Sequence, residues 1–263
     1  MEIEKQKSKR IGKYVYSIKD KPISKSIGTV YKCSKWNGPD SVMTVISPYY
    51  GKQIENLEAL LYKCDKVLSY DEIIKSKRGT YYLVSRNCLG GTLKGYLMSR
   101  GGKLPVIESL RIVHQIASAF MTIDEGNKGL LPHRALTLDN VWNEMDWSGG
   151  LDILISQFGL GIISKDYLYM SPEMLKGGRV DKITDVWSAG IILYELIYGK
   201  KPWSASSRKE MIEKISNIEL DTDSSLISGL LANMLQIDPK QRFDWKSTYK
   251  YISYLLLFMR VLK

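Results

Sequence analysis

The sequence predicts an α+β fold with two lobes, a small strand-rich lobe carrying one helix and a larger helical lobe. Two observations predict it. The hydrophobic pattern changes near residue 90 from short β-branched and aromatic runs to helical spacing. The 263 residues, of which 44% are hydrophobic and 25% charged, are ample for a core without disulfides or metal.

The first lobe is predicted to consist mainly of strands, because its runs rich in Tyr, Val and Ile are separated by Gly, Pro, Asn or Asp. These runs are 13–18, 29–35, 42–47 and 81–85. One helix interrupts them, since Ile54, Leu57 and Leu61 recur at helical spacing before a break near Asp65. We assign 1–90 to this lobe, with a connector at 86–91.

The second lobe is predicted to be largely helical. Pro105 and Glu108 open a long helix that ends near Gly126. Strand-like pieces follow at 141–142 and 151–155. Further helices are predicted to begin near Thr184, Ser206, Ser224 and Asp244. Several of them open with a residue that commonly caps a helix N-terminus. These elements place 91–263 in the larger lobe of a single domain over 1–263.

The formal net charge of +10 is unevenly distributed. Residues 1–90 hold 17 Lys+Arg against 9 Asp+Glu, whereas the remainder holds 21 against 19. Such asymmetry is typical of surfaces that meet phosphates, anionic lipid or an acidic protein, and equally of a solvated lysine-rich face. No aromatic-interleaved basic motif accompanies the charge, so we expect no specific nucleic-acid partner.

The cysteines and the apolar runs bear on the compartment. Cys33, Cys64 and Cys88 are odd in number and widely spaced, which favours a reducing, cytoplasmic setting over a disulfide framework or a metal knuckle. Only two histidines are present, which argues against a His-rich metal site. The most apolar run, at 254–262, is interrupted by Arg260 and too short for a membrane helix, so we expect no transmembrane segment. The tail 254–263 suits docking on the second lobe or on a partner.

Five motifs follow one another in the second lobe. They are HRALTLDNV (133–141), QFG (157–159), SPE (171–173), DVWSAG (185–190) and LQIDPKQR (235–242). Their order and spacing resemble those of the eukaryotic protein kinase domain, in which the first three read HRDLKxxN, DFG and APE. Segments 168–176 and 192–203 look most similar to Ser/Thr kinases. The resemblance covers nearly the whole chain and implies a bilobal protein-kinase-like fold.

Structural residues of that family are retained, namely His133, Arg134, Glu173, Asp185 and Arg242. The resemblance implies that Glu173 pairs with Arg242 in a buried ion pair at the base of the lobe. It implies that Asp185 holds the backbone of the catalytic loop and that His133 packs beneath this loop. We therefore expect the internal framework of the fold to be intact.

The residues that perform the family's chemistry are replaced. The resemblance places Ala135 where the catalytic base belongs, and a methyl group neither accepts a proton nor orients a hydroxyl. Thr137 stands in place of the catalytic-loop lysine. Gln157 replaces the metal-binding aspartate, and a neutral amide is a poor ligand for a hard dication. Of the family's metal ligands only Asn140 remains.

The phosphate-binding loop of the first lobe is degenerate as well. ISKSIGTVYK (23–32) resembles the family's glycine-rich loop, but Ser24 and Ser26 replace two of its three glycines. Gly28 and Val30 remain. The glycines of such a loop let backbone N–H groups approach phosphates closely, and side chains obstruct that approach.

The remaining nucleotide contacts of the first lobe are altered. SVMTVIS (41–47) resembles the strand that carries the ATP-binding lysine, with Thr44 in the lysine's place. The helix glutamate that pairs with this lysine in the family is Glu55 or Glu58, and helical register alone does not decide between them. Ser85 falls at the gatekeeper position, and Cys88 in the hinge completes the vestigial cleft.

These replacements predict a pseudokinase, a kinase-like protein without phosphotransferase activity or cofactor, which acts as a scaffold or allosteric regulator. Its expected partners are proteins, an active kinase or a larger complex among them. The first alternative is an atypical active Ser/Thr kinase that has moved its catalytic groups. The candidate groups for that relocation are Lys25, Lys32, Asp139 and Asp152.

A third hypothesis uses the charge of the first lobe. Its basic N-terminal residues would form an arm that faces phosphates or anionic lipid. The residues of this arm are Lys5, Lys7, Lys9, Arg10 and Lys13.

Overall fold

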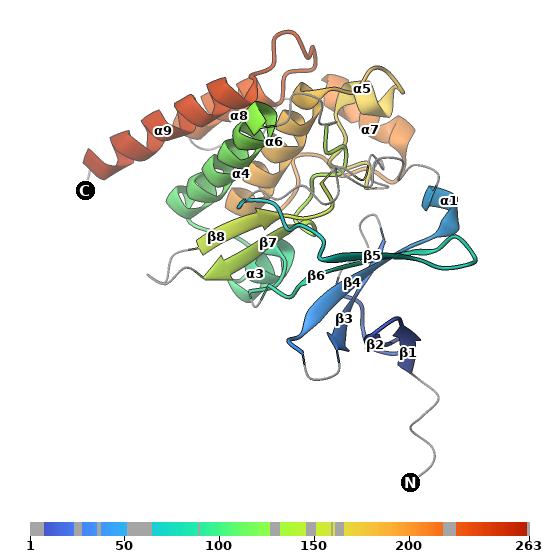
Figure 1. Cartoon of the computed structure of the whole chain (residues 1–263). Coiled ribbons are helices and arrows are strands. Elements are labelled where there is room, and N and C mark those ends of the chain that lie inside the picture. The colour runs from blue at the N-terminus through green and yellow to red at the C-terminus, as the bar shows by residue number, and fades with distance from the viewer. Residues whose placement is uncertain are drawn as a thin grey trace.

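The computed structural model describes residues 8–23, 28–35, 38–51, 65–88, 90–126, 132–145, 151–158, 160, 166–217 and 225–261. One lobe holds a sheet and the other holds most of the helices, so the predicted bilobal α+β fold is confirmed (Figure 1). The strand β1 lies at the outer end of the sheet lobe, and the last helix, α9, lies on the far side of the helical lobe.

The sheet lobe is built around one antiparallel sheet. Within the described residues, six strands take the order β1-β2-β3-β4-β6-β5. Their bounds are β1 (Ser8–Ile11), β2 (Tyr14–Ser17), β3 (Thr29–Lys35), β4 (Ser41–Ile46), β5 (Glu72–Lys75) and β6 (Tyr81–Arg86). Thr44 on β4 is opposite Val30 on one side and Leu83 on the other, so it lies in the interior of the sheet.

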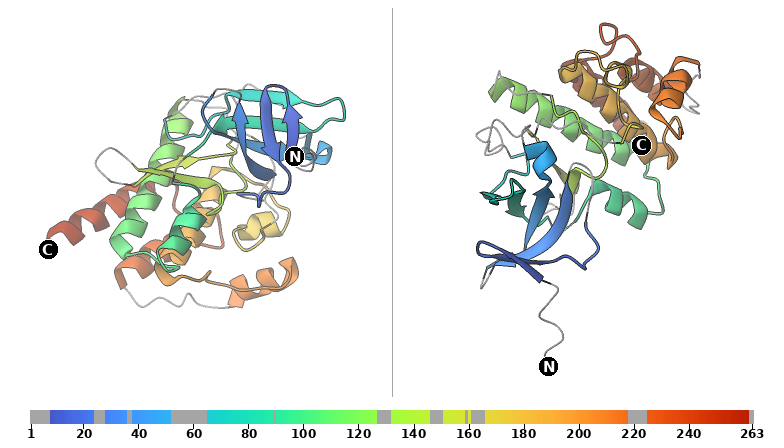
Figure 2. Two further views of the ribbon diagram at one scale, coloured as in Figure 1. Left: turned by 90° about the horizontal axis from the view of Figure 1, so that it is seen from below. Right: turned by 90° about the vertical axis from the view of Figure 1, so that its right-hand side faces the viewer.

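The helical lobe is organised around two long helices, α4 and α6. The described helices are α1 (Pro48–Gly51), α3 (Leu93–Ser99), α4 (Val106–Gly126), α5 (Pro172–Leu175), α6 (Lys182–Tyr198), α7 (Arg208–Asn217), α8 (Ser225–Met234) and α9 (Trp245–Val261). The hairpin of β7 (Val141–Met145) and β8 (Leu151–Ile155) packs against α4. Helix α9 lies along α4 on the opposite side of the lobe from the sheet (Figure 2). None of the described helices is both long and apolar enough to cross a membrane.

Most predicted elements are present, with bounds that differ by a few residues. Strand β1 was not predicted because its sequence, SKRI, is polar and it forms an exposed sheet edge. Strand β5 has four residues, α5 has four, and α3 carries a glycine in a seven-residue helix, so none shows a clear period. The predicted helix around residues 54–61 lies outside the described residues. The lobe boundary after residue 90 stays a prediction; β6 ends at Arg86 and α3 begins at Leu93.

Helix α6 is almost entirely buried, and one glycine sets its distance from a neighbour. Asp181 caps its N-terminus by accepting a bond from the N–H of Ile183, and Gly199 ends it in the left-handed conformation. At Gly190 a β-carbon would come within 2.8 Å of the Leu235 side chain and 3.1 Å of Met234. The helix therefore approaches the end of α8 too closely for any side chain at this position.

The substitution Gly190→Ala is predicted to destabilise the protein by about 1–3 kcal/mol, because overpacking outweighs the better helix propensity of alanine. Denaturant unfolding followed by circular dichroism measures this change. The matched control is Gly95→Ala in α3, where a β-carbon meets nothing closer than 3.6 Å. That variant should be more stable by about 0.5–1 kcal/mol, and equal effects of the two substitutions would contradict the packing argument.

Candidate functional site

A buried carboxylate anchors the loop that corresponds to the catalytic loop. Asp185, in the first turn of α6, accepts hydrogen bonds from the main-chain N–H groups of His133 at 2.7 Å and Arg134 at 2.9 Å. Burial raises the pKa of Asp185 to about 7, although both N–H bonds oppose the rise. Arg134 has a φ of +65°, so this anchor also holds a residue in the left-handed region.

His133 lies beneath the same loop as a neutral, fully buried side chain. Its Nε2 lies 2.9 Å from the carbonyl oxygen of Ser156, and its Nδ1 accepts the N–H of Ala135 at 3.3 Å. Burial lowers the pKa of His133 to about 4. The Phe158 ring meets the imidazole edge to face at 5.6 Å. His133 thus supports the loop from below and carries no charge near neutral pH.

The amide of Asn140 is engaged by the loop itself. Its Oδ1 accepts the N–H of Thr137 at 2.9 Å, and its Nδ2 donates to the carbonyl oxygen of Ala135. The Thr137 hydroxyl accepts the N–H of Asp139 at 3.2 Å. Asn140 is fully buried, and Thr137 is 2% exposed. The residue that resembles a metal ligand and the one in the lysine's place therefore both stabilise the loop.

Ala135, at the position of the catalytic base, lies in an apolar environment. It belongs to one buried cluster with residues of the sheet lobe and with Leu160, which is completely buried. The other members are Ile46, Tyr70, Tyr81 and Leu83. A carboxylate at position 135 would have to be buried among these side chains, which is costly without a partner charge. This packing was not predicted from the sequence, because Leu160 and Tyr70 carry no motif.

Gln157, at the position of the metal-binding aspartate, is 2% exposed and has a φ of +64°. Its Oε1 has no hydrogen-bond partner among the described residues. Burial raises the pKa of Tyr70, and the main-chain N–H of Gln157 opposes this rise. The backbone at this position is therefore strained, and the side chain is a buried amide that is not accessible to a metal ion.

The indole of Trp142 is buried together with two residues of the vestigial cleft, Val30 and Cys88. Trp142, on β7, is 2% exposed and packs with Val30 and Cys88, which are equally buried. The other buried members of this cluster are Val42, Leu68 and Leu154. The indole N–H donates to the Ser156 hydroxyl at 3.0 Å, which fixes the ring. Sequence reasoning missed Trp142; the available signal was a bulky aromatic residue two positions after Asn140.

Gly28 is required by packing within the sheet lobe. A β-carbon there would lie 2.7 Å from the carbonyl oxygen of Val45 and 3.1 Å from the side chain of Thr44. The glycine therefore permits close approach to β4. The neighbouring loop positions Ser24, Lys25 and Ser26 lie outside the described residues.

The other vestigial positions of the sheet lobe are buried. Thr44 is 4% exposed, and Ser85, opposite Val42 in the sheet, is 2% exposed. Neither is accessible to a phosphate. The predicted helix residues Glu55 and Glu58 lie outside the described part of the chain, so no partner for Thr44 is assigned from that helix.

Three of the four groups proposed for a relocated active site, Lys32, Asp139 and Asp152, lie in the described part of the chain. Asp139 lies 3.6 Å from the ammonium of Lys94, and Asp152 on β8 pairs with Lys66 at 2.5 Å. Lys32 is exposed on β3. The described residues contain no group of three or more His, Cys, Asp or Glu side chains placed to hold a metal ion.

The basic segment proposed as an arm is partly built into the sheet. Lys9 and Arg10 belong to β1; Lys9 donates to the Tyr82 hydroxyl at 3.2 Å. Lys13 pairs with Glu72 at 2.5 Å. Lys5 and Lys7 lie outside the described residues.

A buried ion pair ties the segment before α6 to the base of the helical lobe. Arg242 binds both carboxylate oxygens of Glu173, with Nη1–Oε1 at 2.7 Å and Nη2–Oε2 at 2.9 Å. The Arg242 side chain is fully buried and also donates to the main chain of Gln236 and Ile183. Burial alone would raise the pKa of Glu173, but the bonds from Arg242 hold it below its usual value.

Comparison with known proteins identifies the overall pattern. The family model described as protein kinase domain matches residues 26–252. Serine/threonine-protein kinase 33 of Bos taurus is 27% identical over 212 residues, which cover 70% of this chain and 42% of that protein. Calcium-dependent protein kinase 5 of Plasmodium falciparum (isolate 3D7) is 27% identical over 260 residues, covering 90% and 45%.

A further relative is serine/threonine-protein kinase ULK3 of Xenopus laevis, which is 31% identical over 182 residues, or 65% of this chain and 39% of that protein. The chain therefore spans less than half the length of these curated relatives.

The substitution Glu173→Gln is predicted to cost about 3–5 kcal/mol of unfolding free energy, because it leaves the Arg242 charge buried without its counterion. Equilibrium denaturation measures the loss. The control is Asp124→Asn, which breaks the exposed pair with Lys182, in which each side chain is 47% exposed. That change should stay below about 1 kcal/mol. A small effect at Glu173 would show that the pair is not structural.

The buried imidazole predicts a particular pH dependence. Because the folded-state pKa of His133 is lowered, its stabilising contribution is complete above about pH 6.5 and is lost as the pH falls toward 4. Asp185, with a raised pKa, contributes in the opposite sense: its stabilisation is complete below about pH 4 and is lost as the pH rises through 7. The two contributions oppose each other between these limits.

Replacing His133 by Phe removes one of the two contributions. The destabilisation of His133→Phe relative to the native protein should shrink by about 1.4 kcal/mol per pH unit as the pH falls from 6.5 toward 4. Denaturant titrations at several pH values measure this slope. The control His114→Phe removes a half-buried imidazole and should give a smaller slope. A destabilisation independent of pH at position 133 would contradict the assignment.

Proposed function

This chain belongs to the protein kinase family, and we propose that it is a pseudokinase: a kinase-like domain that binds protein partners and transfers no phosphate. One observation carries the proposal. Trp142 is buried in one apolar cluster with the cleft residues Val30 and Cys88, and Ala135, at the position of the catalytic base, is buried in another with Leu160.

The chemistry of phosphoryl transfer supports this proposal. The reaction depends on positioned charges, and the loss of a single transition-state contact typically lowers the rate by about 10²–10³. Here Thr44, Ala135, Thr137 and Gln157 replace two lysines and two carboxylates. These groups act as a unit, so their losses need not multiply, but no charged side chain remains at any of the four positions.

The packing supports the same proposal independently of the missing charges. A nucleotide base could enter only by displacing the Trp142 indole, which is buried and hydrogen-bonded to Ser156. Breaking this contact would leave the Ser156 hydroxyl and the apolar wall of the cluster exposed to solvent. We therefore propose that Mg-ATP does not bind, and that the domain needs no cofactor.

The alternative of an atypical active kinase is favoured by the names of the relatives, all of which are protein kinases by name. It requires displaced acids to hold a metal. Asp139 and Asp152 instead lie beside Lys94 and Lys66. In an active kinase these two acids would have to leave their lysine partners to hold a metal, whereas a pseudokinase requires no such rearrangement.

The proposed role is that of a scaffold or allosteric regulator in a reducing, cytoplasmic compartment. Cys33 and Cys88 are free thiols, and burial raises the pKa of Cys33 to about 11 and that of Cys88 to about 12. Both thiols are therefore protonated and unreactive near neutral pH. The buried Glu173–Arg242 pair stabilises the helical lobe and depends on none of the replaced catalytic positions.

Nucleotide binding provides the test. Mg-ATP should leave the melting temperature of the native protein unchanged, and the pure protein should transfer no phosphate to a Ser/Thr peptide. Trp142→Leu removes the blocking indole, so a base can enter. At a ligand concentration of 100 times Kd this variant would gain about 2.7 kcal/mol, with no dependence on Mg²⁺.

The matched control is Trp203→Leu, which truncates a tryptophan that stacks on Trp187 in the helical lobe. It should be destabilised but show no response to nucleotide. A Mg²⁺-dependent shift in the native protein, or phosphate transfer that is lost in Asp139→Asn or Asp152→Asn, would favour the relocated active site and overturn the proposal.

A further inference from the structure

Helix α9 presents one face to the protein and leaves the opposite face uncovered. Its buried residues, Trp245, Thr248, Ile252 and Leu255, pack toward the helical lobe. On the neighbouring helix α4, His114 lies 2.9 Å from the Ser253 hydroxyl and stacks on Tyr249 at 4.1 Å. The helix is therefore fixed in position, and its outer face is a preorganised surface (Figure 1).

The second half of this outer face is apolar. Tyr254 is 78% exposed, Leu257 61%, Phe258 48% and Val261 78%. These residues stand at i, i+3, i+4 and i+7, so they form one continuous stripe over two helical turns. Single exposed apolar residues are ordinary on protein surfaces, but four in one stripe mark an interaction site.

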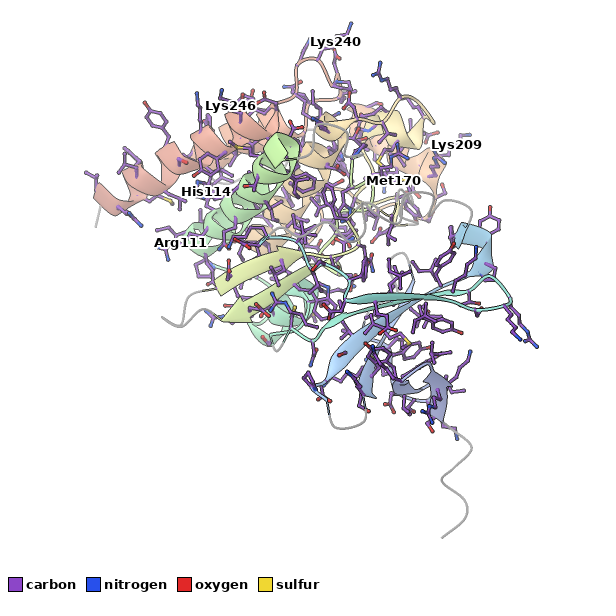
Figure 3. The ribbon with its side chains drawn as sticks, in the orientation of Figure 1. Arg111, His114, Met170, Lys209, Lys240 and Lys246 are labelled. Atoms are coloured by element: carbon purple, nitrogen blue, oxygen red, sulfur yellow. The ribbon has the colours of Figure 1, made fainter. Side chains whose placement is uncertain are left out.

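The first half of the same face is cationic. Lys246 and Lys250 precede Tyr254 by eight and four residues, which places all three in one row along the helix. Both lysines are exposed, and Lys246 lies near the Asp244 carboxylate, whose pKa it helps to lower. Figure 3 shows Lys246 on α9, and His114 and Arg111 on α4. No acidic residue occurs in α9.

We propose that this outer face of α9 docks an acidic amphipathic helix of a protein partner. Apolar side chains of that helix would pack on the stripe from Tyr254 to Val261, and its carboxylates would meet Lys246 and Lys250. Such a contact between two helices would bury the apolar half of the face and pair its cationic half with carboxylates. The inference deepens the proposed binding function and rests on it in one respect, that the domain acts through a protein partner.

A second copy of the chain fits this face poorly. Two α9 helices aligned in parallel would bring Lys246 and Lys250 against the same lysines of the other copy. Aligned antiparallel, they would place the cationic half of one against the apolar half of the other. Both arrangements leave the lysines without a carboxylate partner, and the antiparallel one also places charge against the apolar stripe. An acidic amphipathic helix supplies a match for both halves.

An anionic membrane is favoured less than a helix. Membrane binding of an interfacial helix scales with its buried apolar area, and this stripe offers four side chains over two turns. The opposite face of α9 is committed to the helical lobe and cannot add to that area.

The test uses a synthetic fluorescent peptide helix as the probe, with leucines at i, i+3, i+4 and i+7 and glutamates in the adjoining turns. Two versions place the glutamates before or after the leucines. Fluorescence anisotropy with the full chain should show binding of at least one version that weakens as the salt concentration rises. A peptide with lysine in place of glutamate should bind at least about tenfold more weakly.

Variants of the chain locate the site. Leu257→Ser and Lys250→Glu are each expected to weaken binding about tenfold. The matched controls, Met98→Ser and Lys240→Glu, change an exposed methionine of α3 and an exposed lysine before α9, and should leave the affinity unchanged. The double variant Lys246→Glu/Lys250→Glu should prefer the lysine peptide, which establishes the charge pairing directly.

Three outcomes would overturn the inference. They are no binding of either glutamate peptide, binding that is equal in Leu257→Ser and Met98→Ser, and binding of phosphatidylserine vesicles or self-association that depends on Leu257 in place of peptide binding. Phosphate transfer measured on the same preparation separates the two proposals. Failure of peptide docking without phosphate transfer overturns only the docking site, whereas phosphate transfer overturns the pseudokinase function.

Discussion

The two main-chain bonds accepted by Asp185 are the interaction on which the rest of this structure depends. They hold the N–H groups of His133 and Arg134 and thereby fix the start of the loop that carries Ala135. Further along the loop, the Asn140 amide forms hydrogen bonds with the main chain of Thr137 and Ala135, which stabilise the loop from within. A buried carboxylate is costly unless its hydrogen bonds are satisfied, and here both oxygens accept a bond.

In this chain the residues that support the kinase fold are kept, whereas the residues at the catalytic positions are replaced. The Glu173–Arg242 pair that the family resemblance implied is formed, with two hydrogen bonds between the guanidinium and the carboxylate. The positions that would hold charge for catalysis are apolar or neutral here, and all four are buried. In an active site such positions are held open and charged at a cost in stability. Here Ala135 and Trp142 contribute to the core.

The sequence predicted the fold well because its long elements are strongly periodic. Helices α4 and α9 begin within two residues of the expected starts, at Val106 and Trp245. The pairing of Glu173 with Arg242, 69 residues apart, was implied by the family resemblance and not by any local pattern. The filling of the site was not predicted, because the packing of Trp142 against Val30 and of Ala135 against Leu160 joins segments distant in sequence. No local pattern encodes such contacts.

The central claim is that the chain's own indole occupies the place of a nucleotide base. The indole N–H resonance of Trp142, assigned with a Trp142→Phe variant in ¹⁵N-tryptophan-labelled protein, tests it most directly. The account predicts slow hydrogen exchange for this N–H and an unchanged resonance at saturating Mg-ATP, because the group is buried and donates to Ser156. Rapid exchange together with a large shift on adding Mg-ATP would contradict it.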